Sequence, residues 1–146
     1  MKMDEFAPVI ASQEIEVEAK PDTIWNIIAA VDSWPNWNPD VKAAFIEGDL
    51  AAGTRFSWKA GQWTIRSTVS QMQRPSHLVW TGTTTGIKAV HLWQIEKRGE
   101  KALVRSEESW EGLLPNILRG TMKRMLSRPI QQTLFYLKRE AERRSL

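Results

Sequence analysis

The sequence predicts a single α+β domain in which a seven-stranded antiparallel sheet surrounds a long C-terminal helix. Three observations carry this prediction. A chain of 146 residues has the length of one domain. Residues 41–111 alternate polar and apolar side chains between closely spaced turn signals, which is typical of an antiparallel meander. The last thirty residues repeat apolar side chains at helical spacing, and such a helix needs a large apolar surface to pack on.

The first elements follow a loose leader, which we expect to span residues 1–11 of the single 1–146 domain. From Gln13 onward, apolar and glutamate side chains alternate, which predicts a half-buried strand. Pro21 and Asp22 then open a short helix. The two prolines of the segment 33–39 allow only another turn or two of helix before the next strand. Asn38, in this segment, has either a plain turn role or a place near the mouth of a cavity.

Six further strands are predicted from the alternation and its interruptions, at residues 41–47, 54–59, 62–72, 77–83, 87–97 and 102–111. The final helix is expected to run from Pro115 to Arg144. Pro129 interrupts it, and we expect a bend there because proline removes an intrahelical hydrogen bond. Its apolar side is formed by Leu114, Leu118, Met122, Met125, Leu126, Ile130, Leu134, Leu137 and Ala141.

The composition excludes several classes of protein. Without cysteine the chain has no disulfide framework and no thiolate chemistry. No segment approaches the ~18 apolar residues of a membrane span, and the first five residues lack the pattern of a signal peptide. We therefore expect a cytoplasmic protein without stable membrane insertion. The net charge of +3 is concentrated on the last helix, where a solvated face explains it more simply than a nucleic-acid interface.

The eight tryptophans, against one tyrosine, indicate broad apolar walls. These walls would belong either to an aromatic-rich core or to a cavity. No metal site is predicted, because the two histidines, His77 and His91, fall on opposite faces of neighbouring strands. No cofactor-binding motif is present either.

Polarity and turn positions together predict which side chains meet inside the sheet. A hairpin centred on Gly99-Glu100 places His91 opposite Glu108 and Trp93 opposite Ser106, all on the inner face. The same reasoning, applied to the turns at 85–86, 74–75 and 60–61, gives three more facing pairs: Trp80 with His91, Val69 with Trp80, and Trp58 with Trp63.

The sequence thus predicts an imidazole and a carboxylate, His91 and Glu108, within hydrogen-bonding reach of each other in an apolar setting. Two interpretations stay open. The pair either only stabilises the sheet, or it forms a polar anchor in a cavity that orients a ligand or transfers a proton. Burial would raise the pKa of Glu108 and a protonated His91 would lower it.

Four segments carry a resemblance to a known family. They are Pro21-Asp22-Thr23-Ile24-Trp25, Trp34-Pro35-Asn36-Trp37-Asn38-Pro39, Leu78-Val79-Trp80-Thr81-Gly82 with His91-Leu92-Trp93, and Glu108-Ser109-Trp110-Glu111-Gly112-Leu113-Leu114. Together they resemble the polyketide cyclase/dehydrase branch of the START-like (SRPBCC) superfamily, which has the helix-grip fold of Bet v 1 allergens. The resemblance implies a deep apolar cavity between the sheet and the last helix, with Glu108 facing it.

The predicted ligand contacts come from the inner face of the sheet and from the last helix, which lines the cavity in this fold. They are Phe56, Trp58, Trp63, Ile65, Ser67, Trp80, His91, Trp93, Ser106, Glu108, Trp110, Leu118, Met122 and Met125.

The leading functional prediction is a protein, monomeric or homodimeric, that binds an apolar or aromatic small molecule. The alternative is a cyclase or dehydratase of polyketide-like substrates that uses His91 and Glu108 as base and acid. A third interpretation is an interaction module with a filled core. The sequence leaves open whether any reaction is catalysed.

Overall fold

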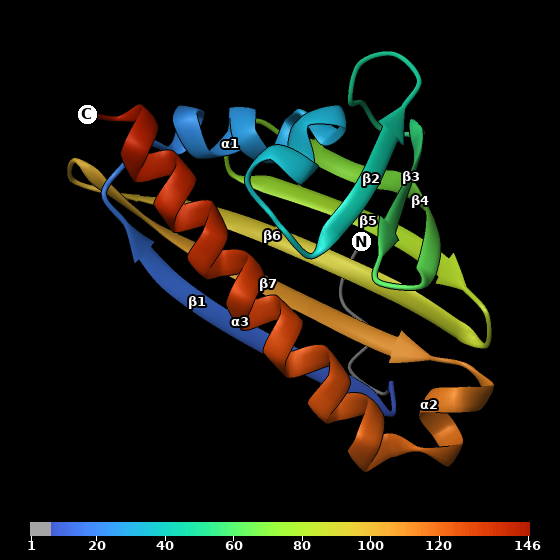
Figure 1. The fold of residues 1–146 in the computed structure, drawn as a ribbon. Coiled ribbons are helices and arrows are strands. Elements are labelled where there is room, and N and C mark those ends of the chain that lie inside the picture. Colours follow the sequence, from blue (N-terminus) through green and yellow to red (C-terminus); the bar gives the residue numbers. More distant parts are fainter. Residues whose placement is uncertain (1–6) are drawn as a thin grey trace.

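The computed structural model describes residues 7–146. Seven antiparallel strands form one sheet in the order β1-β7-β6-β5-β4-β3-β2, and the sheet curves around the C-terminal helix (Figure 1). The strands are β1 (Val9–Val17), β2 (Val41–Ile46), β3 (Arg55–Ala60), β4 (Trp63–Gln73), β5 (His77–Thr84), β6 (Ile87–Arg98) and β7 (Lys101–Glu111). The helices are α1 (Pro21–Ala29), the 3-10 helix η1 (Val31–Asn36), α2 (Leu113–Ile117) and α3 (Arg119–Arg144). The predicted fold class and order of elements are confirmed.

The N-terminal strand starts earlier than predicted. β1 begins at Val9, where Val9 pairs with Trp110 and Ala11 pairs with Glu108 of β7. Val9 and Ala11 are buried, so this part of the expected leader belongs to the sheet. The alternating glutamates begin only at Glu14, which is why the sequence pattern missed these residues. The first six residues of the expected leader lie outside the described residues.

The C-terminal segment forms two helices, α2 and α3, where a single helix was predicted. The chain leaves helical geometry at Leu118, with φ −116° and ψ 45°, and this residue separates α2 from α3. Gly120, a poor helix former, lies two residues further on, in the first turn of α3. α3 instead continues through Pro129, because Leu126 and Ile130 on either side are buried and hold the helix against the interior. The buried side of α3 is formed by Met122, Leu126, Ile130, Leu134, Leu137 and Ala141.

The predicted register of the central strands is confirmed. His91 pairs with Glu108, Trp93 with Ser106, and Trp80 with His91. Val69 also pairs with Trp80, for a reason that the sequence did not indicate. Gln73 pairs with His77, so the turn between β4 and β5 has three residues, and a bulge between Val69 and Gln71 restores the predicted alignment.

One predicted pair is wrong. Trp58 faces Ile65, and Trp63 faces Ala60. The two-residue turn is Gly61-Gln62 rather than Ala60-Gly61, because glycine occupies the first central position, with φ +59°, as this hairpin type requires. This change shifts the pairing of β3 with β4 by two residues. Because two is an even number, the predicted inward faces of both strands are unchanged.

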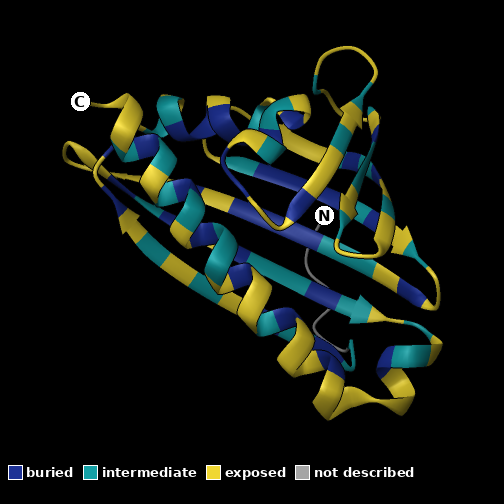
Figure 2. Cartoon of the chain, in the orientation of Figure 1, coloured by how far each residue is buried: buried dark blue, intermediate teal, exposed yellow. Residues whose placement is uncertain are grey.

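Large aromatic side chains fill the interior beside η1. Trp34 contacts the rings of Phe56 and Trp80, with ring centroids 5.6 Å apart in both pairs, and Phe56 meets Trp80 edge-on at 5.3 Å. Figure 2 shows the buried positions along the middle strands and the inner side of α3. Within residues 7–146, no helix combines the length and the apolar character needed to cross a bilayer.

Candidate functional site

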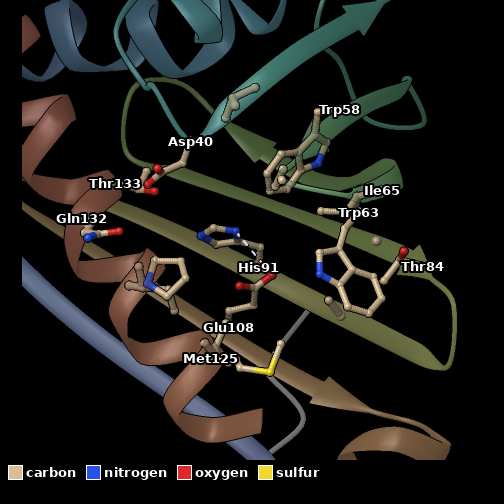
Figure 3. A pocket seen from close by; sticks show the side chains of 18 of the residues that line it. Asp40, Trp58, Trp63, Ile65, Thr84, His91, Glu108, Met125, Gln132 and Thr133 are labelled. Carbon is tan, nitrogen blue, oxygen red and sulfur yellow. Dashed lines mark ion pairs between the residues drawn. The ribbon is translucent and has the colours of Figure 1, made fainter. Parts of the chain in front are cut away.

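A cavity of about 600 Å³ lies between the concave face of the sheet and α3. Its walls come from the loop before β2, from β3 to β7 and from one side of α3 (Figure 3). In Figure 3 Trp58, Ile65 and Trp63 form one side of the space, and Thr133, Gln132 and Met125 of α3 lie on the other. His91 and Glu108 lie between these two sides.

Eight of the fourteen predicted ligand contacts line this cavity. They are Trp58, Trp63, Ile65, His91, Ser106, Glu108, Trp110 and Met125. The sheet positions among them follow from the inward parity of their strands, which the sequence analysis had assigned.

The other six predicted contacts lie outside the lining of this cavity. Phe56 and Trp80 pack on each other in the aromatic core, and Trp93 stacks on the far side of His91. Ser67 is buried as the hydrogen-bond acceptor of Trp58. On the helical side, Met122 is buried in the core, whereas Leu118 is 43% exposed because it lies at the break between α2 and α3.

Two small residues that create the space were not among the predicted contacts, and Asn38 takes the second of the two roles considered for it. Gly82 and Ala89, a facing pair on β5 and β6, line the cavity beside His91. Both positions have inward parity, and their small size on otherwise bulky strands is the signal that could have identified them. Asn38 also lines the cavity and is buried. Its amide nitrogen donates to the Thr133 hydroxyl at 3.4 Å, which ties the loop before β2 to α3.

His91 is held by aromatic rings and one hydrogen bond. Its ring stacks on Trp93, with centroids 5.1 Å apart, and lies 4.9 Å from Trp80. Its Nε2 is 2.7 Å from the hydroxyl oxygen of Ser106. Its Nδ1 is 3.9 Å from Glu108 Oε1, too far for a hydrogen bond. His91 and Glu108 thus face each other as predicted but lie just beyond hydrogen-bonding reach. The hydrogen bond of His91 is made to Ser106, and Nδ1 is buried without a partner among the described residues.

Burial dominates the protonation of both groups. Loss of solvation lowers the pKa of His91 to about 3, so the imidazole is neutral at pH 7. The same cause raises the pKa of Glu108 to about 7, although a hydrogen bond from the Trp110 side chain opposes the rise. The site thus pairs a neutral imidazole with a carboxyl group that is about half protonated near pH 7, and of the two opposing effects expected for Glu108, burial prevails.

The site can form hydrogen bonds and transfer a proton. No group of three or more histidine or acidic side chains within residues 7–146 is arranged to hold a metal ion. His91, Ser106 and Glu108 share the sheet side of the cavity with tryptophan and aliphatic side chains, whereas the loop before β2 and α3 add further polar and charged side chains to its lining. Such an arrangement orients a ligand through a few polar contacts and binds the rest of it through apolar ones.

Comparison with known proteins gives one family and many structures. Residues 8–142 match the family described as polyketide cyclase / dehydrase and lipid transport. No curated protein matches the chain. A START superfamily protein from Mycobacterium smegmatis is 19% identical, with a TM-score of 0.80 over 92% of this chain and 97% of that one.

Two further structures have the same fold. The Zhui aromatase/cyclase from Streptomyces sp. R1128 is 16% identical, with a TM-score of 0.78 over 94% of this chain and 95% of that one. A hypothetical protein from Helicobacter pylori is 14% identical, with a TM-score of 0.84 over 94% and 90% of the two chains. At these identities the comparison establishes the fold.

Proposed function

The chain belongs to the polyketide cyclase / dehydrase and lipid transport family, and we propose that it binds an apolar or aromatic small molecule in the cavity beneath α3. One observation carries this proposal: the unpartnered Nδ1 of His91 and the carboxyl group of Glu108 lie together in a cavity walled by tryptophan. A buried polar atom without a partner is costly, and a ligand atom that bonds to it would remove that cost.

The size and lining of the cavity support a ligand of several rings or a comparable aliphatic chain. Its volume of about 600 Å³ lies within the range of roughly 300–1,000 Å³ that is typical of small-molecule sites. Trp58, Trp63 and Trp110 present broad apolar surfaces for such a body. A hydroxyl or carbonyl group on the ligand would then reach His91 or Glu108, since both groups can donate or accept a hydrogen bond in their neutral forms.

Filling the cavity tests this proposal. Ala89→Leu adds three carbon atoms at the floor of the cavity, whereas Ala43→Leu makes the same change at an exposed position of β2 outside it. Binding is followed by quenching of tryptophan fluorescence with a panel of polycyclic phenols and long-chain fatty acids. We expect Ala89→Leu to weaken binding at least tenfold and Ala43→Leu to leave it unchanged. If no probe binds the unaltered protein, or if both variants bind equally well, the proposal is wrong.

A second candidate function is dehydration or cyclisation of a polyketide-like substrate. The observation that favours it is the pKa of Glu108, raised to about 7, beside a neutral imidazole. Glu108 would protonate a β-hydroxyl group, which leaves as water, while His91 Nδ1 takes the proton from the carbon next to the carbonyl. The carboxylate formed on Glu108 would stabilise the imidazolium. The proton would then return from Nδ1 to Glu108 through the water molecule just released, because the 3.9 Å gap is too long for direct transfer.

The two functions are separated by comparing affinity with turnover. The test uses a β-hydroxy ketone whose dehydration produces a conjugated, absorbing product. For an enzyme, Glu108→Gln lowers the rate by roughly 10²–10⁴-fold while the substrate dissociation constant changes little, and the rate falls above about pH 7 as Glu108 loses its proton. Equal losses of affinity and rate, or no product from the unaltered protein, would leave binding as the function.

A further inference from the structure

Large apolar side chains are exposed together where the sheet ends and the C-terminal helices begin. Leu113 and Ile117, one turn apart on α2, are 70% and 66% exposed, and Leu118, next in the chain, is 43% exposed. Figure 2 shows exposed residues gathered on α2 and the first turns of α3, at one end of the molecule. We call this surface, from Leu113 to Arg124, the α2–α3 corner. Single exposed apolar residues need no explanation, but three within six residues mark an interaction surface.

The corner belongs to a strongly basic stretch of the chain and contains three of its cationic residues. Between Glu111 and Glu140 the sequence contains six lysine or arginine residues and no aspartate or glutamate. All 17 acidic residues, against 14 basic ones, therefore lie in the rest of the chain. Arg119, Lys123 and Arg124 are exposed, and their side chains form no ion pair or hydrogen bond with any other residue of the described chain.

At the C-terminal end of α3, by contrast, three cationic side chains are paired with glutamates. Arg143 and Arg144 both contact Glu140, and Lys138 contacts Glu142. A solvated helix face normally carries such pairs, because opposite charges four residues apart stabilise the helix. Their absence from the first turns of α3 leaves a net positive charge that a negative partner can neutralise.

The corner is held in place and adjoins the cavity. Leu114 donates its backbone N–H to the carbonyl oxygen of Gly86 at 3.3 Å, and Pro115 is buried. α2 is thereby fixed on the sheet with Leu113 and Ile117 left outward. Arg124 belongs to the corner and also lines the cavity, so anything that covers the corner lies at one side of the cavity wall.

We infer that the α2–α3 corner docks on the surface of an anionic lipid bilayer. Leu113, Ile117 and Leu118 would enter the boundary between headgroups and acyl chains, and Arg119, Lys123 and Arg124 would contact lipid phosphates, as in interfacial amphipathic segments. A purely electrostatic partner would explain the cations but not the exposed leucine and isoleucine side chains. The inference is independent of the proposed ligand, because it concerns the outer surface of the protein rather than its cavity.

Vesicle flotation with the full chain tests the inference. We expect binding to vesicles of phosphatidylcholine with 30% phosphatidylglycerol and much weaker binding to pure phosphatidylcholine. Lys123→Glu/Arg124→Glu should lower the partition coefficient at least tenfold, since each cation near such a membrane contributes roughly fivefold. Leu113→Ser/Ile117→Ser should lower it by a similar factor. Lys20→Glu/Lys97→Glu, a matched charge reversal at exposed positions outside the corner, should lower it much less.

Several outcomes would overturn the inference. Absence of binding to the anionic vesicles is one, and an equal loss from the control pair is another. Binding that the Leu113→Ser/Ile117→Ser variant retains would show a charge-only surface, suited to an acidic protein rather than to a bilayer. A concentration-dependent dimer that this variant abolishes would assign the corner to a second copy of the chain. Circular dichroism of each variant establishes that it is folded, and Ala89→Leu, with its cavity filled, should still float with the vesicles.

Discussion

The concave face of the sheet has a packed half and a hollow half, and on β5 and β6 they differ in the size of the inward side chains. In the packed half, Trp80 on β5 meets the rings of Trp34 and Phe56, and Trp93 on β6 meets the ring of Trp80. Further along the same two strands the inward positions are Gly82 and Ala89, and the cavity begins. His91 lies at the boundary. The cavity therefore exists because Gly82 and Ala89 are small. The tryptophans, whose number first indicated a cavity, either fill the core or form the cavity walls.

Truncating one tryptophan in each half gives the largest expected contrast. Trp80→Ala should lower the free energy of unfolding by about 3–5 kcal/mol, because Trp80 is 4% exposed and surrounded by other rings. Trp63→Ala should cost about 1 kcal/mol or less, because Trp63 is 37% exposed and faces space that is already empty. Urea denaturation measures both values. Equal costs would contradict the distinction between the two halves.

The pH dependence of the free energy of unfolding tests the protonation states of His91 and Glu108 at the boundary between the two halves. The pKa of His91 in the folded protein is about 3, below its ordinary value of 6.5. Between these two pH values the unfolded chain binds a proton at His91 and the folded protein does not, so the free energy of unfolding decreases as pH falls from 6.5 to 3. The folded pKa of Glu108, about 7, lies above its ordinary value of 4.5, so its contribution is complete below 4.5 and is lost as pH rises to 7. Between pH 4.5 and 6.5 the two effects oppose each other.

Single substitutions should separate these two effects. In Glu108→Gln, where His91 alone of the two groups titrates, stability should rise with pH between 4.5 and 6.5, above the range in which the lowered pKa values of Glu140 and Glu142 contribute. In His91→Asn, where only Glu108 titrates, it should fall with pH between 4.5 and 7. Each slope should approach about 1.4 kcal/mol per pH unit, the value for one proton. Urea midpoints at half-unit pH intervals measure it, and the same slope in both variants would contradict the assigned shifts.

The smallest expected effect lies where the two halves meet on β5. A methyl group at Gly82 would come within 3.2 Å of both Ile65 Cγ2 and Ser67 Oγ. Ser67 is held by the Trp58 indole, whereas Ile65 borders the cavity and can move into it. Gly82→Ala should therefore change the free energy of unfolding by less than about 1 kcal/mol and weaken ligand binding severalfold. Isothermal titration with the best probe measures the affinity, and a large loss of stability would show that Ile65 cannot move.

The candidate site was predictable to the extent that it depends on strand parity. Alternation and turns placed His91, Glu108, Ser106 and Trp110 on one inner face, and the structure has them there. The same reasoning failed for Trp58 and Trp63, because moving the turn by one residue shifts the strand pairing by two residues, and such a shift leaves the inward faces unchanged. The register of Val69 was correct only because a bulge compensated a three-residue turn.

From the amino-acid sequence alone follow the order of the strands, the inward faces of the strands and the facing pairs from Trp80 to Glu108. These are local properties, fixed by side-chain periodicity and by the residues that each turn requires. Only the tertiary structure decided which inward side chains fill the core and which border a cavity, that His91 bonds to Ser106 rather than Glu108, and that the C-terminal helix is divided at Leu118. These depend on how closely α3 and η1 approach the sheet, and that distance follows from packing side chains far apart in the sequence.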